Sequence, residues 1–233
     1  MSHNVTAGFE DRYFKSDIGL QGAPAQSPAV GSRPLSLRYL ARAEQPEYGI
    51  GGFLEYVVNL DGGRGNDDVS YNAARAGARR GWDAFRYGLD ATYAFGGGWS
   101  FVGRLRGQEA NQPLIPGEQF GLGGVGSVRG LRERETSGDK GTFVNLEVHA
   151  PAWNDISPFA FYDAGWRKHV TPVAGLPTSD SVASVGIGAR WSWERKLEVS
   201  ATIATVVNGV SLGTSPATDS GHSKLNFSIF YRF

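Results

Sequence analysis

The chain contains no cysteine and one methionine among its 233 residues. The lack of cysteine excludes a disulfide scaffold and every metal site that depends on thiolates. Lys plus Arg and Asp plus Glu number 23 each, so the formal net charge is zero. No long basic run offsets this balance. Because nucleic acid is bound largely through positive charge, we expect no nucleic-acid partner.

Long hydrophobic runs are also missing. No window offers the roughly 18 continuous apolar residues that a membrane-spanning helix needs. This absence does not exclude a membrane β-barrel, which has apolar residues only at every second position. The N-terminal stretch "MSHNVTAGFEDRYF" has neither a basic nor an apolar region of the signal-peptide type. The chain is therefore expected to be mature or truncated, unless the protein stays in the cytoplasm.

Glycine is abundant, with 33 residues, and aromatic residues make up 12% of the chain. Apolar and polar residues alternate with a period of two, which indicates strands rather than helices. In "FRYGLDATYAF", Phe85, Leu89 and Tyr93 share one face, and Arg86 and Asp90 share the other. The pattern predicts ten strands, near 3–14, 33–43, 48–60, 82–95, 98–107, 142–150, 158–167, 182–193, 196–207 and 223–233. Most have the length of a strand that crosses a bilayer at a tilt, about 9–11 residues.

The connections alternate between long and short along the whole chain. The long ones cover 15–32, 61–81, 108–141, 168–181 and 208–222, and the short ones include "GGG" and "WERK". An up-and-down barrel in an outer membrane has short turns on one rim and long loops on the other. The sequence therefore favours an all-β transmembrane antiparallel barrel, with a soluble barrel or sandwich as the alternative.

One face of the predicted strands carries too many charges for a dry core. The opposite face is apolar and is expected to contact outer-membrane lipid, with aromatic residues near strand ends as interfacial girdles. A sandwich core remains the alternative for those aromatic residues. The charged positions are Arg86, Arg104, Arg106, Glu147, Asp163, Arg190 and Arg232.

The longest connection, residues 108–141, includes "LIPGEQFGLGGVGSVRGLRERETSGDKG" and is followed by "FVNLEVHAP" and "FAFYDAGW". Taken alone, Arg129 of "SVRG" would be a solvated loop charge. Together with the downstream F-x-D-x-G pattern, the stretch resembles the barrel of two-partner secretion transporters, the haemolysin-activator and filamentous-haemagglutinin exporters often called TpsB. The resemblance covers roughly residues 82–233 by motif and the rest only by pattern.

The resemblance implies a sixteen-stranded barrel preceded by about two periplasmic POTRA domains. Residues 1–233 are then expected to form the C-terminal ten strands of an N-terminally truncated barrel. Closure of ten strands into a smaller barrel stays open. Loop 108–141 would be the sixth extracellular loop, which in this family folds back into the lumen.

The resemblance also implies that Arg129 pairs with Asp163 and holds the loop in the lumen. A buried guanidinium needs a carboxylate in fork geometry. The motif residues that would support the pair are Gly123, Gly124, Val128, Gly130, Phe161 and Gly165. Family members usually have an aromatic residue after "VRG", so Leu131 leaves the packing of the loop tip in doubt.

Further polar residues are expected to line the lumen, namely Arg104, Arg106 and Glu147. Glu147 is interpreted as general lining rather than a specific partner of Arg129, and His149 as a polar residue at a strand end. The four histidines are scattered, so no metal site and no cofactor are expected. Phe233 matches the terminal aromatic residue that barrel assembly machinery reads.

These features favour a pore in the bacterial outer membrane that exports an unfolded partner exoprotein, a haemolysin or adhesin. The chain has no GxxxxGK[ST] motif, so the resemblance implies that folding outside the cell supplies the energy. The alternative is a barrel-assembly insertase or a surface-antigen relative, which shares both motifs. An enzyme built on Asp163 and Glu147 is not favoured, because no nucleophile or metal cluster accompanies the two carboxylates.

Overall fold

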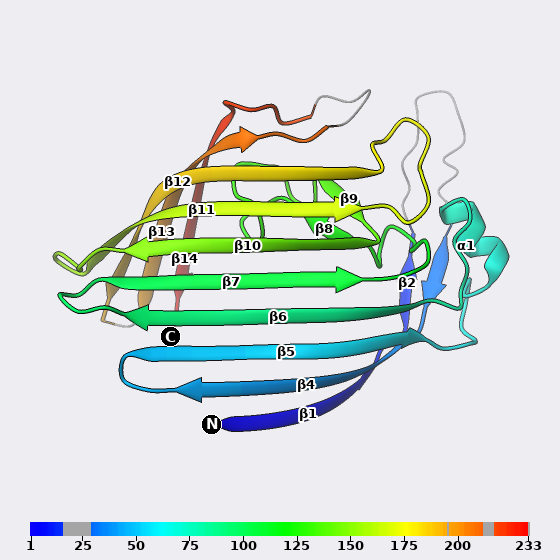
Figure 1. Cartoon of the computed structure of the whole chain (residues 1–233), viewed down its shortest axis with the longest axis horizontal. Coiled ribbons are helices and arrows are strands. Elements are labelled where there is room, and N and C mark those ends of the chain that lie inside the picture. The colour runs from blue at the N-terminus through cyan, green and yellow to red at the C-terminus, as the bar shows by residue number, and fades with distance from the viewer. Residues whose placement is uncertain (16–28, 195, 212–216, 233) are drawn as a thin grey trace.

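The computed structural model describes residues 1–15, 29–194, 196–211 and 217–232. Its main element is a ten-stranded antiparallel sheet in the order β1-β4-β5-β6-β7-β10-β11-β12-β13-β14 (Figure 1). Every strand of this sheet pairs with its predecessor or successor in the up-and-down manner. The predicted all-β class with antiparallel up-and-down topology is confirmed.

The ten strands are 8 to 15 residues long, longer than the five or six residues typical of soluble sheets. Nine of the predicted segments match a strand to within a few residues; the first segment, 3–14, is the exception. The bounds are β1 (Ser2–Phe9), β4 (Pro34–Glu44), β5 (Tyr48–Asn59), β6 (Asp83–Ala94), β7 (Ser100–Glu109), β10 (Lys140–His149), β11 (Ile156–Lys168), β12 (Ser179–Trp193), β13 (Leu197–Asn208) and β14 (Ser223–Tyr231).

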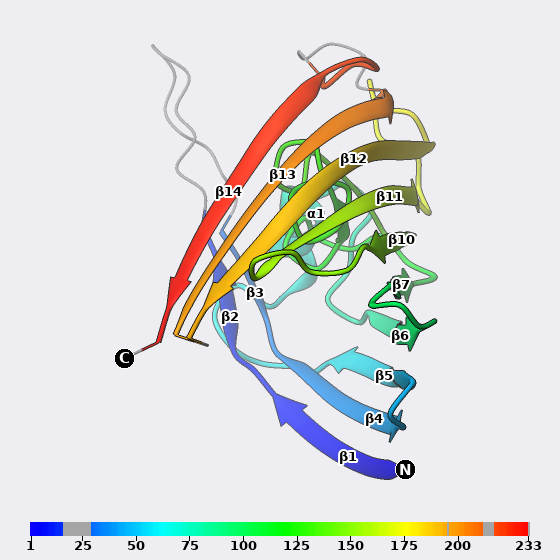
Figure 2. The same cartoon turned by 90° about the vertical axis from the view of Figure 1, so that its left-hand side faces the viewer.

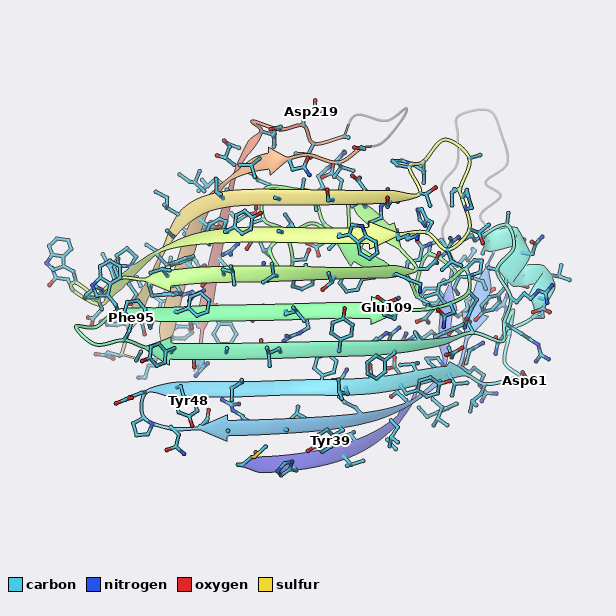
Figure 3. The ribbon with its side chains drawn as sticks, viewed as in Figure 1. Tyr39, Tyr48, Asp61, Phe95, Glu109 and Asp219 are labelled. Carbon is cyan, nitrogen blue, oxygen red and sulfur yellow. The ribbon has the colours of Figure 1, made fainter. Side chains whose placement is uncertain are left out.

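Long and short connections lie at opposite ends of the sheet, as predicted. Asp61, in the long connection after β5, and Glu109, the last residue of β7, lie at one end, while Tyr48 and Phe95 lie beside short turns at the other (Figure 3). We call the end with the long connections the outer rim. Among the described residues, the loops of this rim carry the helix and the three-residue strands of the fold.

The sheet is curved, and loop 108–141 lies on its concave side (Figure 2). The convex face exposes a belt of large apolar side chains. An exposed apolar area of this extent marks a surface that is covered by another apolar phase. The belt includes Leu37, Leu54, Leu89, Tyr93, Val185, Ile187, Ile203, Leu225, Phe227 and Ile229.

No ladder joins β1 to β14 in the described part of the chain, so these ten strands do not close on themselves. The sheet is a curved wall with β1 and β14 at its ends (Figure 2). Membership in a sixteen-stranded barrel is not tested by the described residues and stays a prediction. Among those residues, no helix combines the length and apolar character needed to cross a bilayer.

The predicted first strand was wrong in one respect, because residues 3–14 divide into two strands. After β1, the chain turns inward and β2 (Arg12–Phe14) pairs with β3 (Val30–Ser32) in a separate small sheet. The alternation of apolar residues continues across this break. The pairing register is the same on both sides of the break, and Arg12 of β2 binds Glu118 of loop 108–141 at 2.9 Å.

Two long connections contain structure that periodicity did not predict. The connection after β5 forms helix α1 (Asp68–Ala74), whose N-cap Asp67 accepts a hydrogen bond from the Ser70 N–H. Loop 108–141 contains a hairpin of β8 (Phe120–Leu122) and β9 (Thr136–Gly138). A buried apolar cluster joins α1 to the start of the loop through Tyr71, Trp82, Leu114 and Ile115. The loop is therefore a folded unit that packs on the outer rim.

Candidate functional site

The concave wall carries a row of polar residues that cross-strand pairing aligns. Asp90 on β6 lies opposite Arg104 on β7, which lies opposite Asn145 on β10. Asn145 in turn lies opposite Asp163 on β11. Since directly opposed residues share one face of a sheet, the row places the Asp163 carboxylate on the lumen side at the level of the loop tip.

The structure brings Arg129 and Asp163 into direct contact. The Arg129 Nε and one terminal nitrogen donate to the two Asp163 oxygens, each at 2.7 Å. The Arg129 backbone N–H also donates to Asp163, at 3.0 Å. Asp163 is fully buried and Arg129 is 7% exposed. The fork geometry fits a planar guanidinium, and a lysine would not reproduce it. Whether this pair holds the loop as a functional lock stays a prediction.

Glu147 is a specific partner of Arg129, and its interpretation as general lining was wrong. The second terminal nitrogen of Arg129 donates to Glu147 at 2.7 Å. The other Glu147 oxygen lies 3.0 Å from an Arg190 nitrogen and 2.9 Å from His149. Alternation predicts the face of Glu147 correctly. It does not predict its height along the wall, where Glu147 lies directly opposite Phe161 and diagonally from Asp163 on the neighbouring strand.

Phe161, predicted only as part of a backbone motif, acts through its ring. The Arg129 guanidinium carbon lies 3.5 Å from the centre of the Phe161 ring. Such a contact over a desolvated aromatic face is worth roughly 2 kcal/mol. The ring itself lies over Gly186 of β12, where an added Cβ would meet it at 2.3 Å. The Ile203 carbonyl oxygen, at 2.1 Å, would also clash with this Cβ, so glycine at 186 is needed for the ring to occupy its position.

The motif glycines allow the loop to approach the wall. Gly130 has a φ of +93°, a conformation that other residues rarely adopt. Gly123 and Gly124 also have positive φ angles. At Gly165 on β11, an added Cβ would lie 2.8 Å from Leu122 and 3.3 Å from Val128 of the loop. The F-x-D-x-G glycine thus provides the space in which the loop tip packs.

Leu131 packs where an aromatic residue was expected. It is fully buried with Leu122 and Val128 in an apolar cluster that also includes Val182 and Val206 of the wall. The doubt about packing at the tip is thereby answered, since leucine fills this position. The tip is held by apolar contact on one side and by the Arg129 contacts on the other.

The other predicted lumen residues lie apart from this cluster. Arg106 makes two hydrogen bonds to Asp90, at 2.9 and 2.7 Å, and Arg104 makes one at 3.3 Å. Sequence reasoning gave Asp90 no role, although its position on the polar face of β6 was a sufficient signal. Phe233 lies outside the described residues.

A cavity of about 750 Å³ lies on the lumen side of the loop tip. Charges of both signs line it, including Asp90, Arg104, Arg129, Glu147 and Arg190. A cavity lined by charges of both signs suits the passage of a polar chain better than the storage of an apolar ligand. No group of His, Asp and Glu in the described ranges is arranged to hold a metal ion.

Comparisons with known proteins agree with this arrangement. The chain is 43% identical over 54 residues to the outer membrane transporter CdiB of Dickeya dadantii (strain 3937), a match that covers 23% of this chain and 10% of that protein. Its fold is similar to CdiB from Acinetobacter baumannii, with a TM-score of 0.65 and 18% identity over 98% of this chain and 39% of that one.

A second solved structure, BamA from Haemophilus ducreyi lacking POTRA domains 1-3, gives a TM-score of 0.62 at 15% identity, over 98% of this chain and 51% of that one. The chain therefore spans about half or less of these relatives. The family model of the haemolysin secretion/activation protein ShlB/FhaC/HecB matches residues 55–191. Since that match covers more than half of its residues, the chain belongs to the ShlB/FhaC/HecB family of haemolysin secretion/activation proteins.

Proposed function

We propose that this chain forms the wall of an outer-membrane pore that exports an unfolded partner exoprotein, a haemolysin or adhesin, by two-partner secretion. The protein belongs to a family of outer-membrane transporters and not to a family of enzymes. The observation that carries the proposal is the loop tip docked against the lumen wall through Arg129, Asp163 and Glu147. An obstruction of this kind suits a pore that must be closed at rest.

The two faces of the wall support a membrane pore. The convex face exposes apolar side chains from strands along the whole sheet, and the concave face carries the charged cavity. Apolar side chains in contact with lipid are favourable by roughly 25 cal/mol per Å² of area removed from water. Charges on the same face would be strongly unfavourable, which explains their segregation to the lumen.

Loop 108–141 would act as the gate. While Arg129 is bound to Asp163 and Glu147, the tip occupies the lumen beside the cavity. Release of the tip would leave the two carboxylates facing the cavity, where water can solvate them. An unfolded polypeptide that passes through would then compete for the surface that the tip has left.

The test is secretion of the partner by cells that express the transporter gene with and without Asp163→Asn. The proposed export function predicts that cells with the wild-type transporter release the partner into the medium. The substitution should abolish or strongly reduce this release while the transporter remains in the outer membrane at a normal amount. The matched control is Asp90→Asn, which removes a lumen carboxylate that does not touch the loop.

If the wild type releases no partner, and deletion of the transporter gene instead reduces the insertion of other barrels, the protein is an assembly insertase. If both substitutions leave secretion unchanged, the gate is not built on Asp163. The second outcome leaves the export function intact and removes only the role of the loop.

A further inference from the structure

Two buried carboxylates in loop 108–141 have no part in the tip contacts. Glu118 belongs to the stretch "LIPGEQF" and Asp139 to "SGDKG", on the two legs of the loop. The side chains of both are fully buried. A buried carboxylate is strongly unfavourable unless it is paired and hydrogen-bonded, so each must have a specific set of partners.

Asp139 joins three connections of the outer rim. Arg75, which follows α1, makes a two-point ion pair with its carboxylate. The backbone N–H of Leu114 donates to one Asp139 oxygen and that of Val170 to the other, both at 2.8 Å. Arg75 also donates to the Leu114 carbonyl at 2.8 Å. Burial alone would raise the pKa of Asp139, but the hydrogen bonds from Arg75, Leu114 and Val170 outweigh it and lower the pKa.

Glu118 makes a comparable cluster on the other leg. Arg12 of β2 donates to both of its oxygens, at 3.1 and 2.9 Å. The Ser32 hydroxyl of β3 donates at 2.9 Å, and Arg86 of β6 lies at 3.4 Å. Glu118 therefore ties the loop to the small β2–β3 sheet and to the wall. Arg86, whose face was predicted from alternation, reaches this carboxylate from the wall.

The two clusters flank the β8–β9 hairpin, and the tip that carries Arg129 lies beyond that hairpin. Glu118 precedes β8 by two residues and Asp139 directly follows β9. Residues 122–135 between them contact the wall through the Arg129 cluster and through an apolar cluster. Glu135 also accepts two hydrogen bonds from Thr218 in the connection after β13, both at 2.8 Å. The loop thus has two groups of attachments, one made by its legs at the rim and one made by residues 122–135, with the hairpin between them.

We propose that Glu118 and Asp139 are positioning residues that fix both legs of the loop to the outer rim, so that only the tip, residues 122–135, moves during transport. The proposal rests on the proposed function. The legs keep the loop at the mouth of the pore, and the tip can leave Asp163 and later return to it. Without the rim attachment, the whole loop would leave the mouth once the tip is released.

The first test uses the lack of cysteine, which permits single reporter cysteines. Ile115→Cys reports on the rim and Val128→Cys on the tip, since both native side chains are fully buried. Labelling with a maleimide is measured in cells without the partner, so that the result does not depend on export. Asp139→Asn and Glu118→Gln should each speed labelling at Ile115→Cys by about tenfold or more. Labelling at Val128→Cys should change far less.

The reciprocal variant is Arg129→Ala, which should speed labelling at the tip and not at the rim. The matched control is Glu133→Gln, an exposed carboxylate of the same loop, which should change neither rate. Equal acceleration at both reporters in all variants would show that the loop opens as one unit and would overturn the proposal. Asp139→Glu, which keeps the charge, should restore part of the rim protection.

The second test asks whether the legs stay closed during export. Gly121 and Ser137 are directly paired in the β8–β9 hairpin. The three atoms nearest to a Cβ at Gly121 all belong to the flexible side chain of Arg134, so Gly121→Cys with Ser137→Cys can form a cross-strand disulfide. Secretion should continue in the oxidised state. Loss of secretion that is restored by reduction would overturn the proposal, whereas absence of secretion in the wild type would count against the export function alone.

Discussion

Replacement of Asp163 by asparagine is the sharpest test of the site. Asp163 accepts three hydrogen bonds from Arg129 and one from Asn145, at 2.8 Å. Asparagine keeps the shape of the side chain and removes its charge. The change therefore tests the electrostatic contribution with little effect on packing.

The magnitude follows from the burial of the pair. Removal of one partner of a buried ion pair typically costs about 3–5 kcal/mol. Glu147 remains 2.7 Å from Arg129 and still offsets part of its charge, so the lower end of that range applies. About 3 kcal/mol corresponds to a change of about a hundredfold in the ratio of docked to released tip.

The assay is the labelling rate of Val128→Cys, which is buried when the tip is docked. The rate should rise by about a hundredfold in Asp163→Asn and stay the same in the control Asp90→Asn. An unchanged rate in Asp163→Asn would refute the reasoning, because the tip would then be held by its apolar contacts alone.

Two further predictions concern the loop tip, and a third concerns the attachment at the rim. Glu147→Gln should release the tip less than Asp163→Asn does, because Arg129 keeps its three contacts with Asp163; equal labelling rates at Val128→Cys would contradict this ranking. Gly165→Ala should raise the labelling rate at Val128→Cys without any change of charge, since the new Cβ would lie 2.8 Å from Leu122. A rate equal to that of the wild type would show that the tip accommodates the added methyl group and stays docked. Acid should weaken the attachment at the rim, where His169, which follows β11, lies 3.5 Å from the Arg75 side chain that binds Asp139. Burial and then Arg167 and Arg75 lower the pKa of His169, and together they outweigh the opposite effect of Asp139. As pH falls below the ordinary histidine pKa of about 6.5, His169 binds a proton when the rim contacts are broken but not while they are intact. Acid therefore favours the state in which the rim contacts are broken. Ile115→Cys labelling, normalised to Val69→Cys on α1, should therefore rise between about pH 7.5 and 5.5; a constant ratio would contradict the assignment.

The wall was predictable from sequence because its strands alternate between an apolar convex face and a polar concave face. Phe85 and Arg86 show this directly, since the first is 40% exposed on the convex face and the second binds Glu118 inside. The identity of the buried pair came from the resemblance of "SVRG" and "FYDAG" to a known family. Periodicity assigns a residue to a face and contains no information about which loop residue meets it.

The rim was not predictable, because its contacts join residues that are far apart in the chain. Arg12 and Glu118 are separated by 106 positions, and no periodic pattern links them. Helix α1 had a local signal that went unread, since Asp67 is a favourable N-cap residue and Gly77 follows the helix. Glu147 shows the intermediate case, in which the face was predicted correctly and the partner was not.

The most direct test of the central claim is a disulfide between the loop tip and the wall, formed by Val128→Cys with Val182→Cys. The two valines belong to the same buried apolar cluster, and Val182 is paired with Gly165, against which Val128 packs. The native chain has no cysteine that could compete. The account predicts that the disulfide forms in cells without the partner, blocks secretion, and allows secretion again after reduction. Failure of the disulfide to form, or normal secretion while it is intact, would contradict the claim that the tip closes the lumen and must leave it for export.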